Sequence, residues 1–268
     1  MKRPRWIPEG TDQETPNVAR VYDCYLGGSH NFAADREMAR KAVELWPELP
    51  KIMRANRGFL RRAVQYLAER GFTRFLDIGS GIPTFGAVHE VARRIQPDAR
   101  VVYVDIDPVA VAHSRLILEG DERAAVIEAD MREPRALLAD PAVADLLAAG
   151  EPVAVLLVAV LHFVRDEEDP VGIVRVLRDA MPPGSALVLS HASFEGRPDQ
   201  AGPHQDLYAR TPTPLTMRSR EDVVRLFDGF ELIEPGVVYL PEWRPERPES
   251  VGPHPERMTG LAGVGRLS

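Results

Sequence analysis

The chain has 268 residues, of which 44% are hydrophobic and 27% charged, and its formal net charge is −7. This length favours one domain with additions over two domains, and the acidic balance speaks against a broad nucleic-acid-binding surface. No apolar run approaches the length of a membrane span, and no apolar stretch follows the basic N-terminus as a secretory signal requires. Cys24 is the only cysteine, which excludes an internal disulfide or a cysteine-built metal site and leads us to expect a cytoplasmic protein.

The first 72 residues are predicted to form a tail and three helices. Residues 1–16 are polar and interrupted by proline, whereas apolar residues beyond them recur at three- and four-residue spacing. The predicted helices span 19–26, 32–46 and 51–70. We interpret residues 1–72 as a tail and helical cap that precede a core domain at 73–268. Within that core, the Pro- and Gly-rich residues 194–216 are expected to form a lid insertion.

From Thr73 onward, predicted strands alternate with predicted helices. The strands are short, continuous apolar runs, as expected of parallel strands covered by helices on both faces. They span 74–78, 100–105, 125–128, 153–160 and 186–190. This order predicts an α/β fold with a doubly wound, Rossmann-like sheet.

Helix starts and the C-terminal strands carry their own signals. Asp107 and Asp169 each precede a proline, which is typical of an N-cap followed by proline at the first helical position. Ser219 opens a capping box. Two later β segments, 230–239 and 261–267, have no helix between them. They predict an antiparallel hairpin that closes the sheet.

The most informative stretch is residues 74–86, which we interpret as a strand, a glycine turn and the start of a helix. Gly79, Ser80 and Gly81 form the turn, and the apolar spacing predicts a helix that begins around Thr84. This arrangement forms a site for a nucleotide-like ligand at the carboxyl end of the first strand. A turn without a ligand is the alternative, since Thr84 replaces the third glycine of the dinucleotide fingerprint.

Asp77 lies in the strand, two residues before the first glycine. A carboxylate is costly in a buried strand unless it caps the turn or meets a cation. NAD-binding turns usually have no acid at this position, whereas S-adenosylmethionine carries ammonium and sulfonium charges. Asp77 therefore favours S-adenosylmethionine as the ligand.

An acidic residue also ends the second predicted strand, and another follows the third. Asp105 is expected to accept both ribose hydroxyls, with a role as a second helix cap as the alternative. Asp130 is placed to accept from the adenine amino group while Met131 packs on the ring. An exposed loop acid is an equally good interpretation of Asp130.

Two histidines follow the last parallel strands. His162 follows strand 153–160, and His191 follows strand 186–190. Because both fall at carboxyl ends of neighbouring strands, one of them is a candidate proton acceptor. The alternative is that both are hydrogen-bonded structural groups.

The N-terminal helices supply further candidates for ligand contact. Arg57 is placed to pair with the carboxylate of a ligand, whereas the nearby Arg54 suits a solvated helix face at least as well. Tyr22 and Asn31 flank a pair of glycines, which suits a loop folded over a ligand or a connection between helices.

These segments resemble known methyltransferases. Residues 75–81, 102–108 and Asp130 resemble motifs of the class I S-adenosylmethionine-dependent methyltransferases. Residues 19–23, 27–28, 31–36, 54–57 and 155–164 are similar to an actinobacterial methyltransferase family formerly known as a domain of unknown function. The likeness covers nearly the whole chain from about residue 16.

The resemblance implies a seven-stranded methyltransferase sheet, a helical N-terminal cap and bound S-adenosylmethionine. It adds Ile106 and Leu161 to the predicted cofactor contacts. Cys24 and His30 depart from the family pattern, as does the segment 82–84, where other methyltransferases continue with glycine. Ligand contacts at Cys24 and His30 are therefore not expected.

The sequence thus predicts methyl transfer to oxygen or nitrogen of a small or medium-sized acceptor. No Asn-Pro-Pro-Tyr motif follows strand 153–160 and no Pro-Cys nucleophile exists, which excludes two classes of nucleobase methylation. No acid pair has metal-ligand spacing at the strand ends, so no metal is expected. A non-catalytic S-adenosylmethionine-binding regulator is the main alternative, and an NAD(P)-dependent oxidoreductase is a weaker one.

Overall fold

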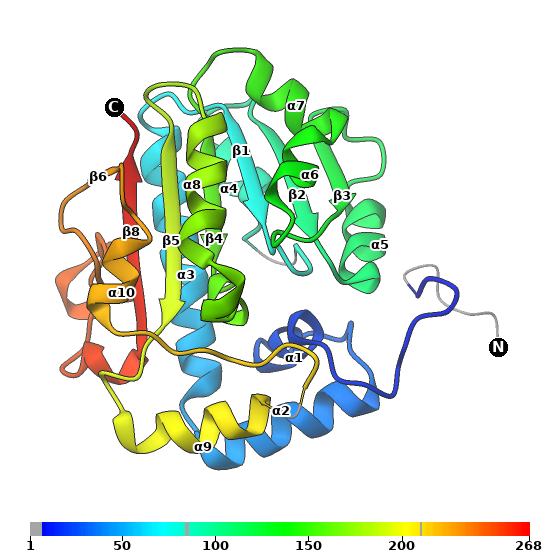
Figure 1. The fold of residues 1–268 in the computed structure, drawn as a ribbon, viewed down its shortest axis with the longest axis vertical. Coiled ribbons are helices and arrows are strands. Elements are labelled where there is room, and N and C mark those ends of the chain that lie inside the picture. Colours follow the sequence, from blue (N-terminus) through cyan, green and yellow to red (C-terminus); the bar gives the residue numbers. More distant parts are fainter. Residues whose placement is uncertain (1–6, 84–85, 210) are drawn as a thin grey trace.

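The fold is centred on one mixed β-sheet (Figure 1). The computed structural model describes residues 7–83, 86–209 and 211–268. The sheet order is β3-β2-β1-β4-β5-β8-β6, and β7 also pairs with β8, so that β6 and β7 share the seventh position. The strands are β1 (Arg74–Ile78), β2 (Arg100–Asp105), β3 (Ala124–Glu128), β4 (Ala154–Val158), β5 (Ala186–Ala192), β6 (Glu231–Leu232), β7 (Val238–Tyr239) and β8 (Gly260–Arg266).

The first five strands are parallel, and the C-terminal strands are antiparallel to them. Strand β8 runs antiparallel between β5 and the pair β6 and β7. The predicted doubly wound sheet with an antiparallel C-terminal closure is therefore confirmed. The predicted strand 230–239 is broken into β6 and β7, because the intervening Pro235 has no N–H for the ladder and Gly236 adopts a φ of 82°.

Helices cover both faces of the sheet because alternate strand residues point to opposite sides. Phe75, Tyr103 and Leu156 belong to one buried cluster, whereas Leu76, Val104 and Leu157 belong to another. The first cluster includes side chains from α3 (Leu49–Ala68) and α4 (Val88–Arg93). The second contains α6 (Pro134–Ala139), α7 (Pro141–Ala148), α8 (Pro170–Ala180) and α10 (Arg220–Arg225). Helix α5 (Pro108–Ile117) packs beside β2 and β3.

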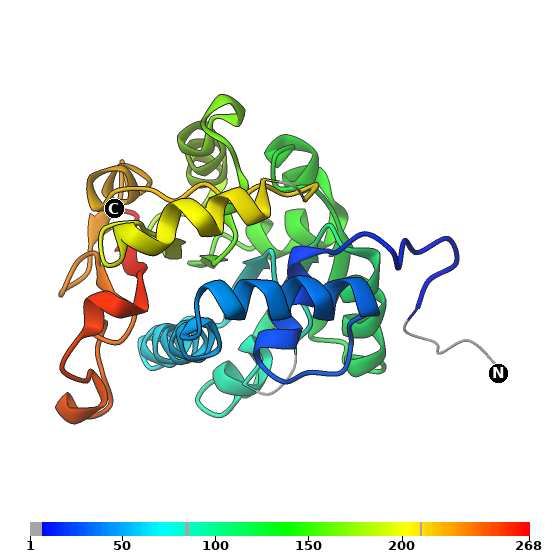
Figure 2. The same ribbon diagram turned by 90° about the horizontal axis from the view of Figure 1, so that it is seen from below.

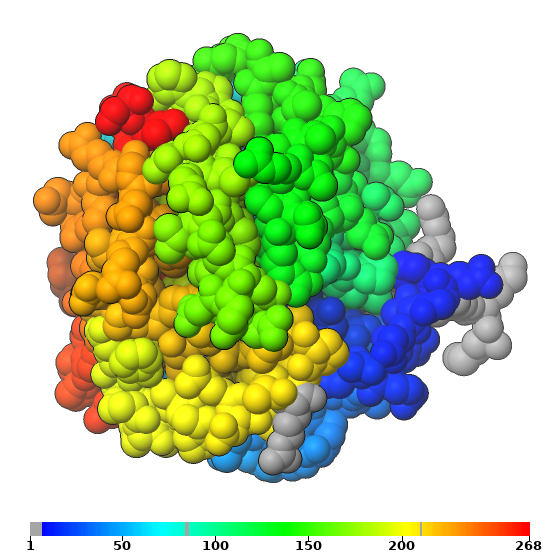
Figure 3. Space-filling view, in the orientation of Figure 1, coloured from blue at the N-terminus to red at the C-terminus, as the bar shows by residue number. Residues whose placement is uncertain are grey.

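Three helices lie across the carboxyl ends of the parallel strands (Figures 1 and 2). They are α1 (Val18–Tyr25), α2 (Ala33–Leu45) and α9 (Pro198–Tyr208). Helix α2 contacts both α1 and α9. Figure 3 shows α9 and the N-terminal segment meeting along the lower edge of this face, so that they cover the end of the sheet where ligands of such folds bind.

Most predicted helix boundaries agree with the structure within a few residues. Asp107 caps α5 by accepting from the backbone N–H of Val109, and Asp169 caps α8 through the N–H of Gly172. The helix predicted to begin around Thr84 begins at Val88, and Thr84 itself lies outside the described residues. The segment predicted as a lid contains α9, with Pro203 inside the helix. Within the described ranges, no helix combines the length and the apolarity that crossing a bilayer requires.

Candidate functional site

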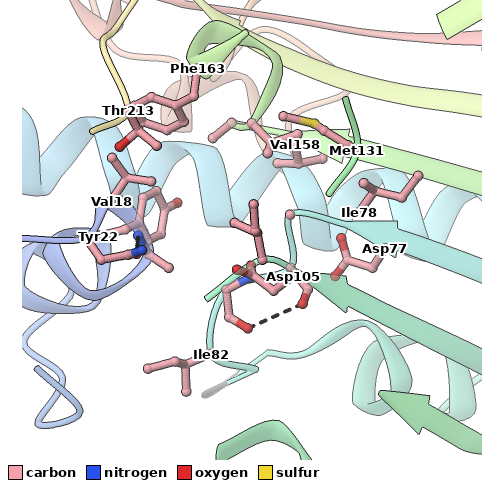
Figure 4. Close-up of a pocket in the computed structure, with 18 of the residues that line it drawn as sticks. Val18, Tyr22, Asp77, Ile78, Ile82, Asp105, Met131, Val158, Phe163 and Thr213 are labelled. Atoms are coloured by element: carbon pink, nitrogen blue, oxygen red, sulfur yellow. Dashed lines mark hydrogen bonds between the residues drawn. The ribbon is translucent and has the colours of Figure 1, made fainter. Parts of the chain in front are cut away.

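A cavity lies at the carboxyl ends of β1, β2 and β4, beneath α1 (Figure 4). Asp77, Ile78 and Asp105 come from the strand ends, and Val18 and Tyr22 face them from α1. Of the predicted cofactor contacts, the cavity is lined by Tyr22, Arg57, Asp77, Gly79, Ser80, Gly81, Asp105, Ile106, Asp130 and Met131. Residues far apart in the sequence therefore share one ligand-sized space.

The glycine turn connects β1 to this cavity. Gly79 and Gly81 adopt φ angles of 71° and 61°, a conformation that side chains with a Cβ rarely adopt. A Cβ at Gly79 would lie 2.2 Å from the side chain of Val160, so this glycine is required for packing. A Cβ at Gly81 would meet no atom of the described residues within 4 Å. Gly81 therefore borders space that a ligand can approach.

Asp77 is a buried carboxylate without a hydrogen bond from any described residue. Its exposed fraction is 5%, and it lines the cavity. Burial raises its pKa from 3.8 to about 7, with Arg57 opposing the rise and Asp105 adding to it. Such a group is stabilised by a cation that enters the cavity and donates to it.

Asp105 is similarly buried, but two backbone N–H groups are partners of its carboxylate. Its carboxylate accepts from the backbone N–H of Gly81 at 2.7 Å and from that of Asp107 at 2.9 Å. Burial raises its pKa, and these hydrogen bonds oppose the rise. Asp105 thus fixes the glycine turn against the start of α5, and it also lines the cavity. The ribose contact predicted for Asp105 stays a prediction.

The wall beyond β2 is made by Ile106, Asp130 and Met131. Ile106 has an exposed fraction of 47%, which is high for a large apolar side chain and offers a flat apolar contact to a ligand. Asp130 accepts from Arg132 through several hydrogen bonds, with a distance of 2.7 Å from Nη2 to Oδ2. This pairing lowers the pKa of Asp130, although partial burial opposes it. Arg132 also lines the cavity, which no sequence pattern predicted.

Arg57 and Tyr22 form the wall next to Asp77. Nη2 of Arg57 donates to the carbonyl of Ile82 at 3.3 Å, which leaves other guanidinium donors unpaired among the described residues. The Tyr22 hydroxyl donates to the carbonyl of Met53 and accepts from Nδ2 of Asn56 at 3.0 Å. Burial raises the pKa of Tyr22, so its hydroxyl remains protonated at neutral pH. The wall therefore presents a cationic donor beside the unpaired carboxylate of Asp77.

Two predicted cofactor contacts lie off the cavity. Asn31 is 7% exposed, and its amide donates to Asp23 at 2.8 Å and to the carbonyl of Gly28 at 3.0 Å. Leu161 is fully buried in the core, and its carbonyl accepts from Arg218. The side chains of Asn31 and Leu161 therefore stabilise the loops around the site and do not line it.

The two candidate bases are held by other groups. Nδ1 of His191 lies 2.8 Å from the carbonyl of Ala192, and its Nε2 lies 2.7 Å from Nη1 of Arg218. Because a carbonyl only accepts and a guanidinium only donates, Nδ1 carries the proton and the lone pair of Nε2 is occupied. Burial lowers the pKa of His191 to about 3. His191 therefore offers no free site for a proton, contrary to the role expected from the sequence.

In His162 the proton lies on the other ring nitrogen. Its Nδ1 accepts from the backbone N–H of Ala192 at 3.3 Å, which assigns the proton of the neutral ring to Nε2. Burial lowers the pKa of His162 well below its usual value. In this tautomer His162 is a hydrogen-bond donor. The structure thus gives neither histidine the free lone pair that a general base needs.

Arg218 organises this region and was not found from the sequence. It is 6% exposed and donates to the carbonyls of Leu161 and Val164 and to Asp166 as well as to His191. These contacts fasten the 3₁₀ turn η1 (Leu161–Phe163) to β5. A single arginine before a capping box gave no signal of this role, because its partners are remote in sequence.

A second cavity adjoins the first. Both are lined by Val18, Tyr22, Asn56, Ala159 and Phe163. The second cavity extends between α1, α3, α9 and the ends of β5 and β8, with Trp46 contributed from just after α2. His162 and His191 belong to its wall. The site therefore consists of two chambers that share one wall.

Comparison with known proteins identifies the family. Residues 4–268 match the family described as S-adenosyl methyltransferase. A DUF574 family protein from Streptomyces avermitilis is 39% identical, with a TM-score of 0.91 over 96% of this chain and 99% of its own. A proposed methyltransferase from Thermobifida fusca is 40% identical, with a TM-score of 0.92 over 98% of this chain and 99% of its own.

A more distant structure shares the fold alone. The N-methyltransferase NodS from Bradyrhizobium japonicum, in complex with S-adenosylhomocysteine, is 11% identical, with a TM-score of 0.52 over 92% of this chain and 98% of its own. A search of curated proteins finds no match to this chain. The match over residues 4–268 and the two close structures place the chain in the S-adenosyl methyltransferase family, as an S-adenosylmethionine-dependent methyltransferase.

Proposed function

We propose that this enzyme methylates an oxygen or nitrogen atom of a small or medium-sized acceptor, with S-adenosylmethionine bound in the first cavity. The observation that carries the proposal is the pair of unsatisfied charges on that cavity. Asp77 accepts no hydrogen bond from a described residue, and among these residues Arg57 donates only to the carbonyl of Ile82, at 3.3 Å. The amino acid end of S-adenosylmethionine carries an ammonium and a carboxylate, which complement these two groups.

The remaining walls suit the nucleoside end of the same cofactor. Asp105 holds the glycine turn and retains acceptor capacity for ribose hydroxyls. Ile106 and Met131 offer apolar surface for a flat ring, and Asp130 offers acceptor atoms at its edge. Gly81 leaves room for close approach to the backbone. The residues present therefore fit the whole cofactor, from its amino acid end to its adenine.

The protein contributes alignment more than proton transfer. S-adenosylmethionine supplies a methyl group that is activated by the positive sulfonium. A lone pair of the acceptor forms a bond to the methyl carbon while the carbon–sulfur bond breaks, and both electrons of that bond stay on sulfur. Holding two reactants in line supplies about 7–11 kcal/mol of a barrier. Neither histidine has a free acceptor nitrogen, so we propose that the acceptor reacts through a lone pair that is already available. Any proton on that atom leaves to water.

Calorimetric titration with S-adenosylmethionine tests cofactor binding directly. We expect saturable binding in the wild type and an at least tenfold weaker affinity in Asp77→Asn, because a charge-assisted hydrogen bond contributes about 1.5–3 kcal/mol. Absence of binding at millimolar cofactor would remove the proposal.

Catalysis is tested by incubating the enzyme with labelled S-adenosylmethionine and fractionated cell extract. We expect a labelled product that contains the transferred methyl group. Cofactor binding without labelled product from any fraction would instead support the non-catalytic regulator. The oxidoreductase alternative is set aside by membership of the methyltransferase family.

A further inference from the structure

We infer that the second cavity is the acceptor site and that it selects an uncharged, flat aromatic molecule that presents a hydrogen-bond acceptor to His162. This inference rests on the proposed function. It goes beyond that function because it specifies the chemical class of the acceptor and names a residue that orients it.

The position of the second cavity suits an acceptor. Tyr22, Asn56 and Phe163 line both chambers, so a molecule in the second lies directly beside a cofactor in the first. The volume of the second cavity is about 80 Å³. A space that admits one water molecule needs about 10–15 Å³ on the same measure. The cavity is therefore several times larger than a site for one water molecule.

The residues that line the second cavity disfavour a charged acceptor. Every described residue that lines the second cavity is uncharged at neutral pH, since burial lowers the pKa values of His162, His191 and His204. An ion taken from water into such a chamber would lose its hydration without finding a counter-charge. The bound form of the acceptor is therefore neutral.

The shape and composition of the wall favour a flat ring. Tyr25, Trp46, Phe163 and Tyr208 surround the chamber with aromatic surface. Tyr25 and Tyr208 are joined by a hydrogen bond of 2.9 Å between their hydroxyls, which fixes both rings. Rigid aromatic walls bind planar apolar ligands through stacked or edge-to-face contacts.

Polar recognition comes from His162. Its Nδ1 accepts from Ala192, so its Nε2 bears a proton, and no described residue accepts that proton. Two deeper polar atoms in the wall, Nε1 of Trp46 and Nδ1 of His204, also have no partner among the described residues. A donor that faces the cavity without a protein partner gains a hydrogen bond when a ligand supplies an acceptor. His162 is thus a positioning residue that would direct an oxygen or nitrogen lone pair of the acceptor.

The test uses three naphthalene probes with the full-length enzyme saturated with S-adenosylhomocysteine. 2-Methoxynaphthalene is neutral and carries an acceptor oxygen, 2-methylnaphthalene lacks the oxygen, and 2-naphthalenesulfonate is permanently charged. Binding is measured by the fluorescence of the probe. We expect saturable binding of 2-methoxynaphthalene and at least 100-fold weaker binding of the sulfonate. Equal binding of the sulfonate, or no binding of 2-methoxynaphthalene, would overturn the inference.

A matched pair of variants tests the role of His162. His162→Asn keeps an acceptor near Nδ1 for Ala192 but removes the Nε2 donor, whereas His162→Gln places an amide donor near Nε2. We expect His162→Asn to weaken 2-methoxynaphthalene binding about fivefold, the value of roughly one neutral hydrogen bond, and to leave 2-methylnaphthalene unchanged. His162→Gln should retain the wild-type preference for 2-methoxynaphthalene. Equal losses for both probes would refute the positioning role.

Titration with S-adenosylhomocysteine itself separates the two levels of the proposal. Failure of the wild type to bind it at millimolar concentration would contradict the proposed function. Normal binding of S-adenosylhomocysteine together with failure of 2-methoxynaphthalene would contradict the acceptor site alone. The same titration verifies that each His162 variant is folded.

Discussion

The replacement Asp77→Asn is expected to stabilise the protein in the absence of cofactor while it weakens cofactor binding. The structural reason is that the Asp77 carboxylate is buried and accepts no hydrogen bond from a described residue. Asparagine has nearly the same shape and carries no charge. The substitution therefore removes a desolvation cost without opening a cavity.

The magnitude follows from the pKa of Asp77, which burial raises from 3.8 to about 7. The folded state binds the proton of Asp77 more tightly than the unfolded state does. The contribution of Asp77 to stability is therefore most favourable at low pH and falls as the pH rises through about 7. At 1.36 kcal/mol for each pH unit, the ionised group lowers the free energy of unfolding by up to about 4 kcal/mol at pH 8. The same linkage gives about 2 kcal/mol at pH 5.

Urea unfolding without ligand measures this difference at both pH values. We expect Asp77→Asn to be more stable than the wild type at pH 8 and to lose half or more of that advantage at pH 5. The control is Asp105→Asn, whose parent carboxylate accepts from two backbone N–H groups and whose amide can satisfy only one of them. This variant should be less stable than Asp77→Asn at pH 8. An Asp77→Asn protein no more stable than the wild type at pH 8, or an advantage independent of pH, would refute the reasoning.

Three further predictions follow from the same geometry. Because a cationic ligand group requires ionised Asp77, the Kd for S-adenosylmethionine measured by calorimetry should rise about tenfold from pH 8 to pH 6, and a constant Kd would contradict this. Gly81→Ala should fold, as judged by circular dichroism, but bind cofactor weakly. Gly79→Ala should unfold at a lower denaturant concentration than the wild type because its Cβ clashes with Val160. Identical behaviour of the two variants would contradict the different roles given to the two glycines. Arg218→Met should lower the free energy of unfolding by about 2–3 kcal/mol, because it leaves buried carbonyl and imidazole acceptors unpartnered, and unchanged urea unfolding would show that these contacts contribute little.

Local physics explains why much of the fold was predictable. A buried parallel strand must be apolar on both faces, so β1 and β2 stand out as continuous runs with the boundaries that the structure confirms. The caps at Asp107 and Asp169 depend only on the next few residues, and both were predicted. The break at Pro235 was missed because the apolar pattern continues on both sides of it.

The candidate site was predictable in position but not in its hydrogen bonds. Topology brings the ends of neighbouring parallel strands together, so Asp77 and Asp105 were expected on one cavity. Which nitrogen of His191 is occupied depends on Arg218, and the amide of Asn31 depends on Asp23. These partners follow from tertiary packing, for which no short sequence pattern gives a signal.

The contrast between Asp77 and Asp105 shows how hydrogen-bond partners distinguish a ligand-binding group from a scaffold group. Both carboxylates end neighbouring strands and both are buried. Asp105 accepts from two backbone N–H groups and therefore stabilises the turn, whereas the unpaired Asp77 costs stability until a cation arrives. The same criterion separates the histidines of the second chamber, because Arg218 occupies the lone pair of His191 while the Nε2 proton of His162 remains free. A polar group that the described fold leaves without a hydrogen-bond partner marks a place where a ligand can bind, and Asp77 and His162 are such groups on the walls of the two adjoining chambers.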